Sequence, residues 1–155
     1  MTTARQFFET VREASKDAER CRTQLLRLEG RARSLGGGGF EPRTRSTPDP
    51  QRAQRRMDAY MDQERRLERR MDEDYDVIGR SDVVLYGDAG RPGLDRVQSP
   101  VWADVLWWRY LDDATWDAVA DAVGYSPRTC QEMCDQALAW IDRVRFMSTV
   151  IDSVN

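Results

Sequence analysis

Residues 115–142 read TWDAVADAVGYSPRTCQEMCDQALAWID, and this stretch decides the fold of the chain. Thr115 can cap a first helix with its hydroxyl, and Gly124 breaks that helix where the backbone needs a left-handed residue. Ser126 and Pro127 are the preferred cap and first residue of a second helix. The stretch predicts a helix-turn-helix. Apolar residues recur at helical spacing on both sides of the turn, at Val119, Ala120, Val123, Cys130, Met133, Ala137 and Leu138.

Short motifs lie in and before this stretch: VLWWRY at 105–110, Thr115-Trp116, Val119-Ala120, GYS at 124–126 and Ala137-Leu138. They resemble region 4 of bacterial sigma factors. They are still more similar to the phage regulators of late transcription of the ArpU/RinA type, which carry a sigma-like helix-turn-helix. The resemblance covers residues 99–142 and implies a sequence-specific DNA-binding transcription regulator of phage or mobile-element origin. DNA is then the expected partner, and RNA polymerase is an optional one.

The DNA-binding candidates lie on the outward side of the second predicted helix, whose N-terminal half enters the major groove in this kind of motif. Arg can bind guanine, Gln adenine, and Glu can accept a hydrogen bond from cytosine. The resemblance implies base-reading positions at Pro127, Arg128, Gln131 and Glu132, although Pro127 and Gln131 stand where the family usually has basic residues. The full candidate set is Ser126, Pro127, Arg128, Thr129, Gln131, Glu132 and Asp135.

Charge is distributed unevenly along the 155 residues, whose net charge is −3. Residues 1–71 carry 17 basic and 11 acidic side chains, a net charge of +6, whereas residues 97–155 carry 4 and 9, a net charge of −5. The negative net charge of the helix-turn-helix disfavours DNA binding, because phosphate contacts supply most of the affinity. A basic stripe on the preceding helix either contacts phosphate or is a solvated face. The candidates for phosphate contacts are Arg55, Arg56, Arg65, Arg66, Arg109 and Arg143.

The N-terminal part predicts a long helical arm. Residues 4–35 carry apolar side chains in a thin heptad seam, and a Gly/Pro-rich linker at 36–50 separates them from a second helix at 50–86. The seam closes either within the chain, as a hairpin, or between chains, as a coiled coil in a homo-oligomer. We therefore expect an all-α protein without a sheet, with a helical arm at 1–86 and a helix-turn-helix domain at 97–155.

Composition argues against several other classes. The chain has no apolar run long enough to span a bilayer and no signal-peptide core, so a cytoplasmic protein is expected. It has no histidine and three cysteines, of which Cys130 and Cys134 are one helical turn apart. A metal site would need more ligands, and the glycines at 36–39 lack the Lys and Ser/Thr of a phosphate-binding loop. We therefore expect that the protein is not an enzyme and has no catalytic residue, cofactor or metal.

A different function class stays open beside the regulator. A helix-turn-helix can be plain packing, because DNA binding depends on surface residues rather than on the fold. The alternative is a non-enzymatic helical interaction protein, such as an RNA polymerase adaptor or a small DNA-packaging subunit, that uses the same domain for protein contacts. Trp107 stands where the sigma-like pattern usually has a polar or basic residue, so its exposure would indicate a partner surface.

Overall fold

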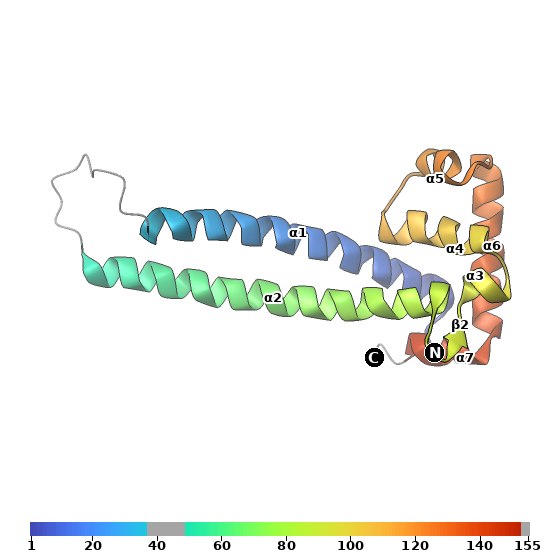
Figure 1. Ribbon diagram of the computed structural model, residues 1–155, viewed down its shortest axis with the longest axis horizontal. Helices are drawn as coiled ribbons and strands as arrows, with labels where there is room; N and C mark the ends of the chain where they lie inside the picture. Colours follow the sequence, from blue (N-terminus) through green and yellow to red (C-terminus); the bar gives the residue numbers. More distant parts are fainter. Residues whose placement is uncertain (37–48, 153–155) are drawn as a thin grey trace. The chain divides into compact units, whose positions relative to one another are not determined.

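The computed structural model describes residues 1–36 and 49–152, and these residues are almost entirely helical (Figure 1). This confirms the all-α class. The two long helices come first, and short elements follow. In order, the elements are α1 (Ala4–Gly36), α2 (Pro50–Tyr86), β1 (Gly87–Asp88), β2 (Arg91–Pro92), α3 (Leu94–Val97), α4 (Pro100–Leu106), the π-helix η1 (Trp107–Leu111), α5 (Trp116–Val123), α6 (Pro127–Arg143) and α7 (Arg145–Asp152).

A two-strand ladder corrects the expectation that no sheet is present. β1 and β2 pair antiparallel, with Gly87 opposite Pro92 and Asp88 opposite Arg91. Gly87 has φ of +81°, and a Cβ there would lie 2.2 Å from the carbonyl oxygen of Arg91. Only glycine fits so close a backbone approach, so this turn joins α2 to α3 as a tight hairpin.

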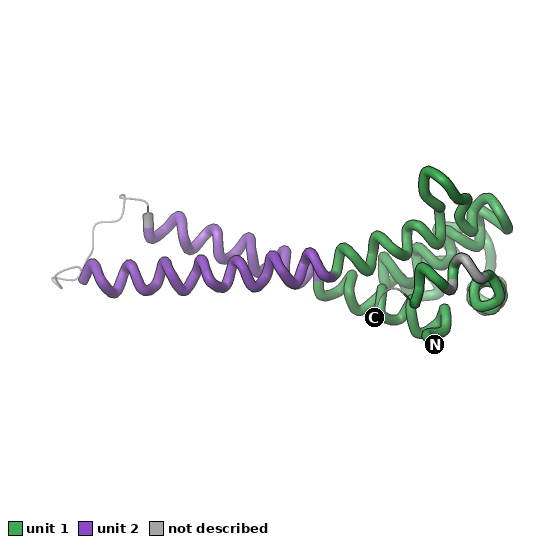
Figure 2. Tube along the Cα trace, turned by 90° about the horizontal axis from the view of Figure 1, so that it is seen from below, with its two compact units in different colours: residues 1–17, 74–155 green, residues 18–73 purple. Residues whose placement is uncertain are grey.

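The chain divides into two compact units, and each boundary falls inside a long helix (Figure 2). Unit 1 comprises Met1–Asp17 and Asp74–Asn155, and unit 2 is Ala18–Glu73. The predicted division at 86 and 97 followed chain order and assigned all of α1 and α2 to the arm. The structure instead groups the ends of both helices with the later elements, because those ends carry the large apolar side chains.

The core of unit 1 explains why the first turns of α1 belong to it. Phe7, Phe8 and Val11 are fully buried, and the ring centroid of Phe8 lies 5.4 Å from that of Tyr110 in η1. The other large buried side chains come from α2, α3, α4, α6 and α7. They are Val84, Leu85, Leu94, Val105, Leu106, Ile141, Met147 and Ile151.

The helices of unit 1 contain two irregularities. The apolar run 100–111 continues from α4 into η1, where Trp107 and Trp108 form an edge-to-face pair with centroids 5.1 Å apart. Trp107 is half-buried and packs against the core, so it is not an isolated exposed surface. α6 ends at Arg143, and extended Val144 separates it from α7.

Unit 2 is a hairpin of two antiparallel helices that lie side by side (Figure 1). Leu25, Leu28 and Ala32 of α1 face Met57 and Tyr60 of α2 across a groove of about 260 Å³. These seam residues thus pack against α2 of the same chain. Positions 37–48 of the predicted linker lie outside the described residues. No helix among the described residues is long and apolar enough to cross a membrane.

Candidate nucleic-acid interface

The turn between α5 and α6 is fixed by the residues that the sequence singled out. The Thr115 hydroxyl accepts a hydrogen bond from the Ala118 N–H at 3.3 Å, and the Ser126 hydroxyl accepts one from the Thr129 N–H at 3.1 Å. Gly124 is left-handed, with φ of 81° and ψ of 24°, and its N–H donates to the Ala120 carbonyl at 2.9 Å. The predicted caps and the predicted turn glycine are therefore confirmed.

The inner face of this helix pair is apolar and sulfur-rich. Cys130 and Cys134 are buried free thiols, and the Cys134 sulfur lies 4.0 Å from the Tyr110 hydroxyl. Burial raises the pKa of both thiols, that of Cys134 to about 11. Thiols that stay protonated at neutral pH pack as small apolar groups. Val119, Ala120, Ala137, Leu138 and Ile141 complete this face.

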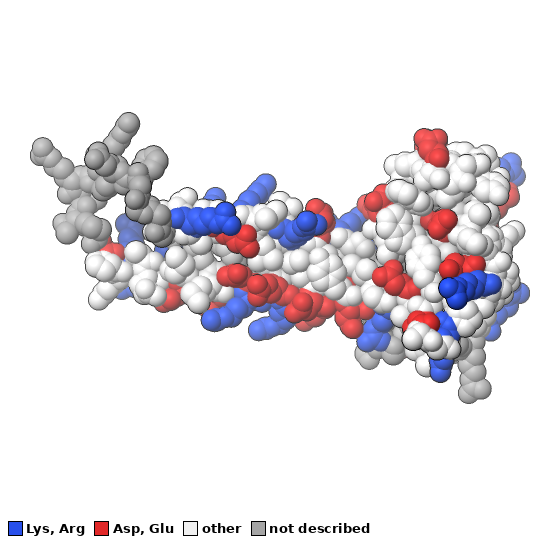
Figure 3. Space-filling view, in the orientation of Figure 1, with Lys and Arg blue, Asp and Glu red and all other residues white. Residues whose placement is uncertain are grey.

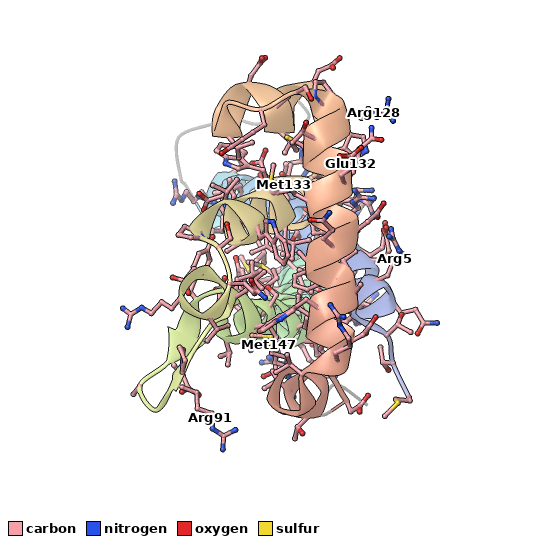
Figure 4. The ribbon with its side chains drawn as sticks, turned by 90° about the vertical axis from the view of Figure 1, so that its right-hand side faces the viewer. Arg5, Arg91, Arg128, Glu132, Met133 and Met147 are labelled. Atoms are coloured by element: carbon pink, nitrogen blue, oxygen red, sulfur yellow. The ribbon has the colours of Figure 1, made fainter. Side chains whose placement is uncertain are left out.

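The outer face of α6 gathers the predicted candidates on one exposed surface, which we call the α6 face. Arg128 and Glu132 project from the same side of the helix, whereas Met133 points toward the interior (Figure 4). Thr129 is half-buried at the edge. The exposed members of the α6 face are Ser126, Pro127, Arg128, Gln131, Glu132 and Asp135.

Charges on the α6 face are paired rather than uniformly basic. Arg128 Nε lies 3.3 Å from Glu132 Oε1, one turn further along the helix. The side chain of Arg128 is 89% exposed, so water screens this pair and it contributes little stability. The free energy needed to separate the two side chains is correspondingly small.

A second cation reaches the α6 face from α1. Arg5 Nη2 lies 2.6 Å from Asp135 Oδ1, and this hydrogen bond is the main reason that the pKa of Arg5 is raised. Arg5 lies beside α6 in Figure 4. Sequence reasoning missed it, because helical periodicity predicts which face a residue occupies but not which helix 130 residues away lies against it. Arg5 and Arg128 together balance Glu132 and Asp135.

The corner before α5 is held by α1 as well. Asp113 has φ of +56°, and its carboxylate lies 3.1 Å from Arg12 Nε and 3.7 Å from Lys16 Nζ. The Arg12 guanidinium also stacks 5.0 Å from the centroid of the Tyr110 ring. These contacts fix the chain between η1 and α5, so Arg12, Lys16 and Asp113 are positioning residues for the helix pair.

Arg109 and Arg143, the two candidates for phosphate contacts outside α2, have different surroundings from each other. Arg109 Nη1 donates to the Ala114 carbonyl at 2.9 Å, and its guanidinium lies 4.5 Å from the centroid of the Trp116 ring. It therefore holds the start of α5. Arg143 is exposed at the last residue of α6, about 24 Å along the helix from Pro127 at 1.5 Å per residue.

The predicted arginines of α2 fall into two groups. Arg65 Nη1 lies 3.4 Å from Asp62 Oδ1, and Arg66 donates to Gln63 Oε1 at 2.9 Å. Arg55 and Arg56 are exposed, and no ion pair joins them to any other described residue. Figure 3 shows side chains of both signs on this arm and several acidic side chains on unit 1.

No family model, curated protein or solved structure matches the chain.

Proposed function

We propose that the protein is a sequence-specific DNA-binding transcription regulator of phage or mobile-element origin that reads the major groove with the α6 face. One observation carries the proposal. The turn and both caps fix the start of α6, while the polar side chains of its first three turns stay exposed. A rigid helix that presents unburied polar side chains is what base reading in the major groove requires.

The side chains of the α6 face suit distinct parts of a DNA site. Arg128 can donate two hydrogen bonds to guanine, and Gln131 can pair with adenine. Arg128 must leave Glu132 to do so, and separating an exposed pair costs under about 1 kcal/mol. Arg5, at the edge of this face, suits a phosphate oxygen.

Electrostatics limits how tightly the α6 face can bind DNA alone. Residues 97–155 carry 4 basic and 9 acidic side chains, so long-range attraction to DNA from this region is unfavourable. A regulator built this way needs further cations elsewhere on the chain or a partner on the promoter. RNA polymerase fits the second role.

Enrichment of DNA from a random pool by the full chain tests the proposal. Wild type should select a defined sequence, and Arg128→Ala should relax preference at one base position, at a cost of about 1–3 kcal/mol. Arg143→Ala removes the same charge from the other end of α6 and should leave the preference intact. The proposal fails if wild type enriches no sequence, alone or with RNA polymerase.

The non-enzymatic interaction protein is the second candidate, and an acidic patch on unit 1 favours it. Burial, and next the negative charges of Asp104, Asp82 and Asp95, raise the pKa of the Tyr86 hydroxyl to about 12. Asp95 Oδ1 is buried without a hydrogen-bond partner among the described residues. Such a patch suits a basic segment of another protein. Under this alternative, Asp104→Asn weakens capture of a polymerase or packaging partner and Arg128→Ala does not.

A further inference from the structure

Unpaired arginines gather at the end of the unit 2 hairpin, in residues 27–36 of α1 and 49–61 of α2. These segments hold six basic and three acidic side chains, a net charge of +3, whereas residues 18–26 and 62–73 hold six of each. All six arginines are exposed. We call them the distal arginines: Arg27, Arg31, Arg33, Arg52, Arg55 and Arg56.

The two helices bring these arginines to the same level of the hairpin. Ala32 and Arg33 of α1 line one groove together with Met57 of α2, so the end of α1 lies beside the start of α2. Apolar side chains along the groove hold the two helices together there. The distal arginines therefore surround one end of the hairpin and are drawn from two helices.

The helix dipoles of the arm explain only part of this positive charge. Arg33 lies in the last turn of α1, where a cation favours the helix dipole, whereas Arg52 lies near the start of α2, where a cation opposes it. The Asp49 carboxylate, which accepts a hydrogen bond from the Gln51 N–H at 3.0 Å, offsets part of this charge. The nearby carboxylate of Asp58 accepts a hydrogen bond from Gln54 at 2.9 Å. None of the distal arginines forms an ion pair with another described residue. Their charge is thus available to an external anion.

We propose that the distal arginines bind the phosphate backbone of double-stranded DNA, as a contact separate from the α6 face. This rests on the proposed function, because it supplies the sequence-independent attraction that acidic unit 1 lacks. Guanidinium groups match phosphate oxygens with two parallel hydrogen bonds, and duplex DNA presents one negative charge per about 1.7 Å of axis. The surface contributes affinity and salt dependence and no base preference.

Two matched double variants of the full chain test this. Arg55→Gln/Arg56→Gln removes two distal arginines, whereas Arg65→Gln/Arg66→Gln removes the same charge from residues 62–73 of the same helix, where basic side chains do not outnumber acidic ones. The measurement is the dissociation constant for a fixed duplex of arbitrary sequence against salt concentration. The distal variant should lower the slope of log K against log salt by about 1.8. Over a fourfold range of salt concentration, its affinity should therefore fall about tenfold less than the affinity of wild type. The control variant should keep the wild-type slope.

The outcomes separate this inference from the function on which it rests. An unchanged slope in the distal variant, with helix content retained, overturns the inference even if wild type selects a DNA sequence. An equal loss in both variants also overturns it, because the charge of the whole arm would then be responsible. So does a distal variant whose sedimentation mass differs from that of wild type without DNA, because the arginines would then contact a second copy of the chain. Loss of slope in the distal variant alone supports the inference, even where wild type shows no base preference.

Discussion

At the scale of single residues, the backbone and the side chain of Asp113 both help to fix the corner before α5. A non-glycine residue with φ of +56° is held against its own preference, although aspartate tolerates this region better than most residues. Its carboxylate faces Arg12 and Lys16 of α1. The strained residue therefore joins the corner before α5 to the first turns of the chain.

Two substitutions at this residue separate the backbone from the ion pairs. Asp113→Ala loses the carboxylate and keeps the steric penalty, so we expect a loss of about 1–2 kcal/mol in the free energy of unfolding. Asp113→Gly loses the same carboxylate but relieves the backbone, so it should be less destabilising than alanine. Urea unfolding of the full chain measures both. A glycine variant as unstable as the alanine variant would mean that backbone strain at Asp113 is negligible.

At the scale of elements, the turn before α6 depends on one left-handed glycine. A Cβ added at Gly124 meets no atom within 4 Å, so its φ of +81° is the only obstacle to another residue. Gly124→Ala should therefore cost about 1 kcal/mol, and Gly124→Asn less, because asparagine adopts this conformation more readily.

Gly79 supplies the matched control for that prediction. It lies inside α2, is exposed and also has open space where a methyl group would lie, but its backbone is helical. Gly79→Ala should stabilise the protein by about 0.5–1 kcal/mol, since alanine is the better helix former. Thermal melts should thus shift in opposite directions for the same chemical change. A stabilising Gly124→Ala would contradict the role assigned to the turn.

Local signals explain which elements were predictable. Ser126, Pro127 and Gly124 act on their immediate neighbours, so the bounds of α5 and the start of α6 followed from the sequence. The break at Val144 carries no Gly or Pro, and the apolar run around Trp107 fits a π-helix as well as an α-helix. The partnership of Arg5 with Asp135 depends on tertiary packing alone. The outward side of α6 was predictable, but the cation beside it was not.

At the scale of the whole molecule, ionised carboxylates lower the stability of the folded state by an amount that varies with pH. Burial, and next the charge of Asp95, raise the pKa of Asp104. A carboxyl whose pKa is raised by folding stabilises the folded state while protonated, and that stability is lost as pH rises through the folded pKa. The ionised Asp104 therefore destabilises unit 1 at neutral pH.

Asp104→Asn should accordingly raise the melting temperature at pH 7 and have little effect near pH 3, where both side chains are neutral. Asp117→Asn should instead lower the melting temperature at pH 7. Asp117 lies in the first turn of α5, where a negative charge interacts favourably with the helix dipole. Calorimetry at the two pH values checks both. Equal stabilisation by Asp104→Asn at pH 3 and pH 7 would show that its charge is not responsible.

The packing of the first turns of α1 into unit 1 also determines the order in which the chain can fold. The Ala4 N–H donates to Asp142 at 2.6 Å across 138 residues of sequence, and the Thr2 N–H to Asp152 at 3.2 Å across 150. During synthesis, Phe7 and Phe8 leave the ribosome long before α6 and α7, their partners in the core, exist. The hairpin of unit 2 needs only neighbouring helices and can form early, whereas unit 1 closes only after the last helices emerge. A nascent chain stalled before α6 would thus display two unshielded phenylalanines, which makes it a ready client for chaperones.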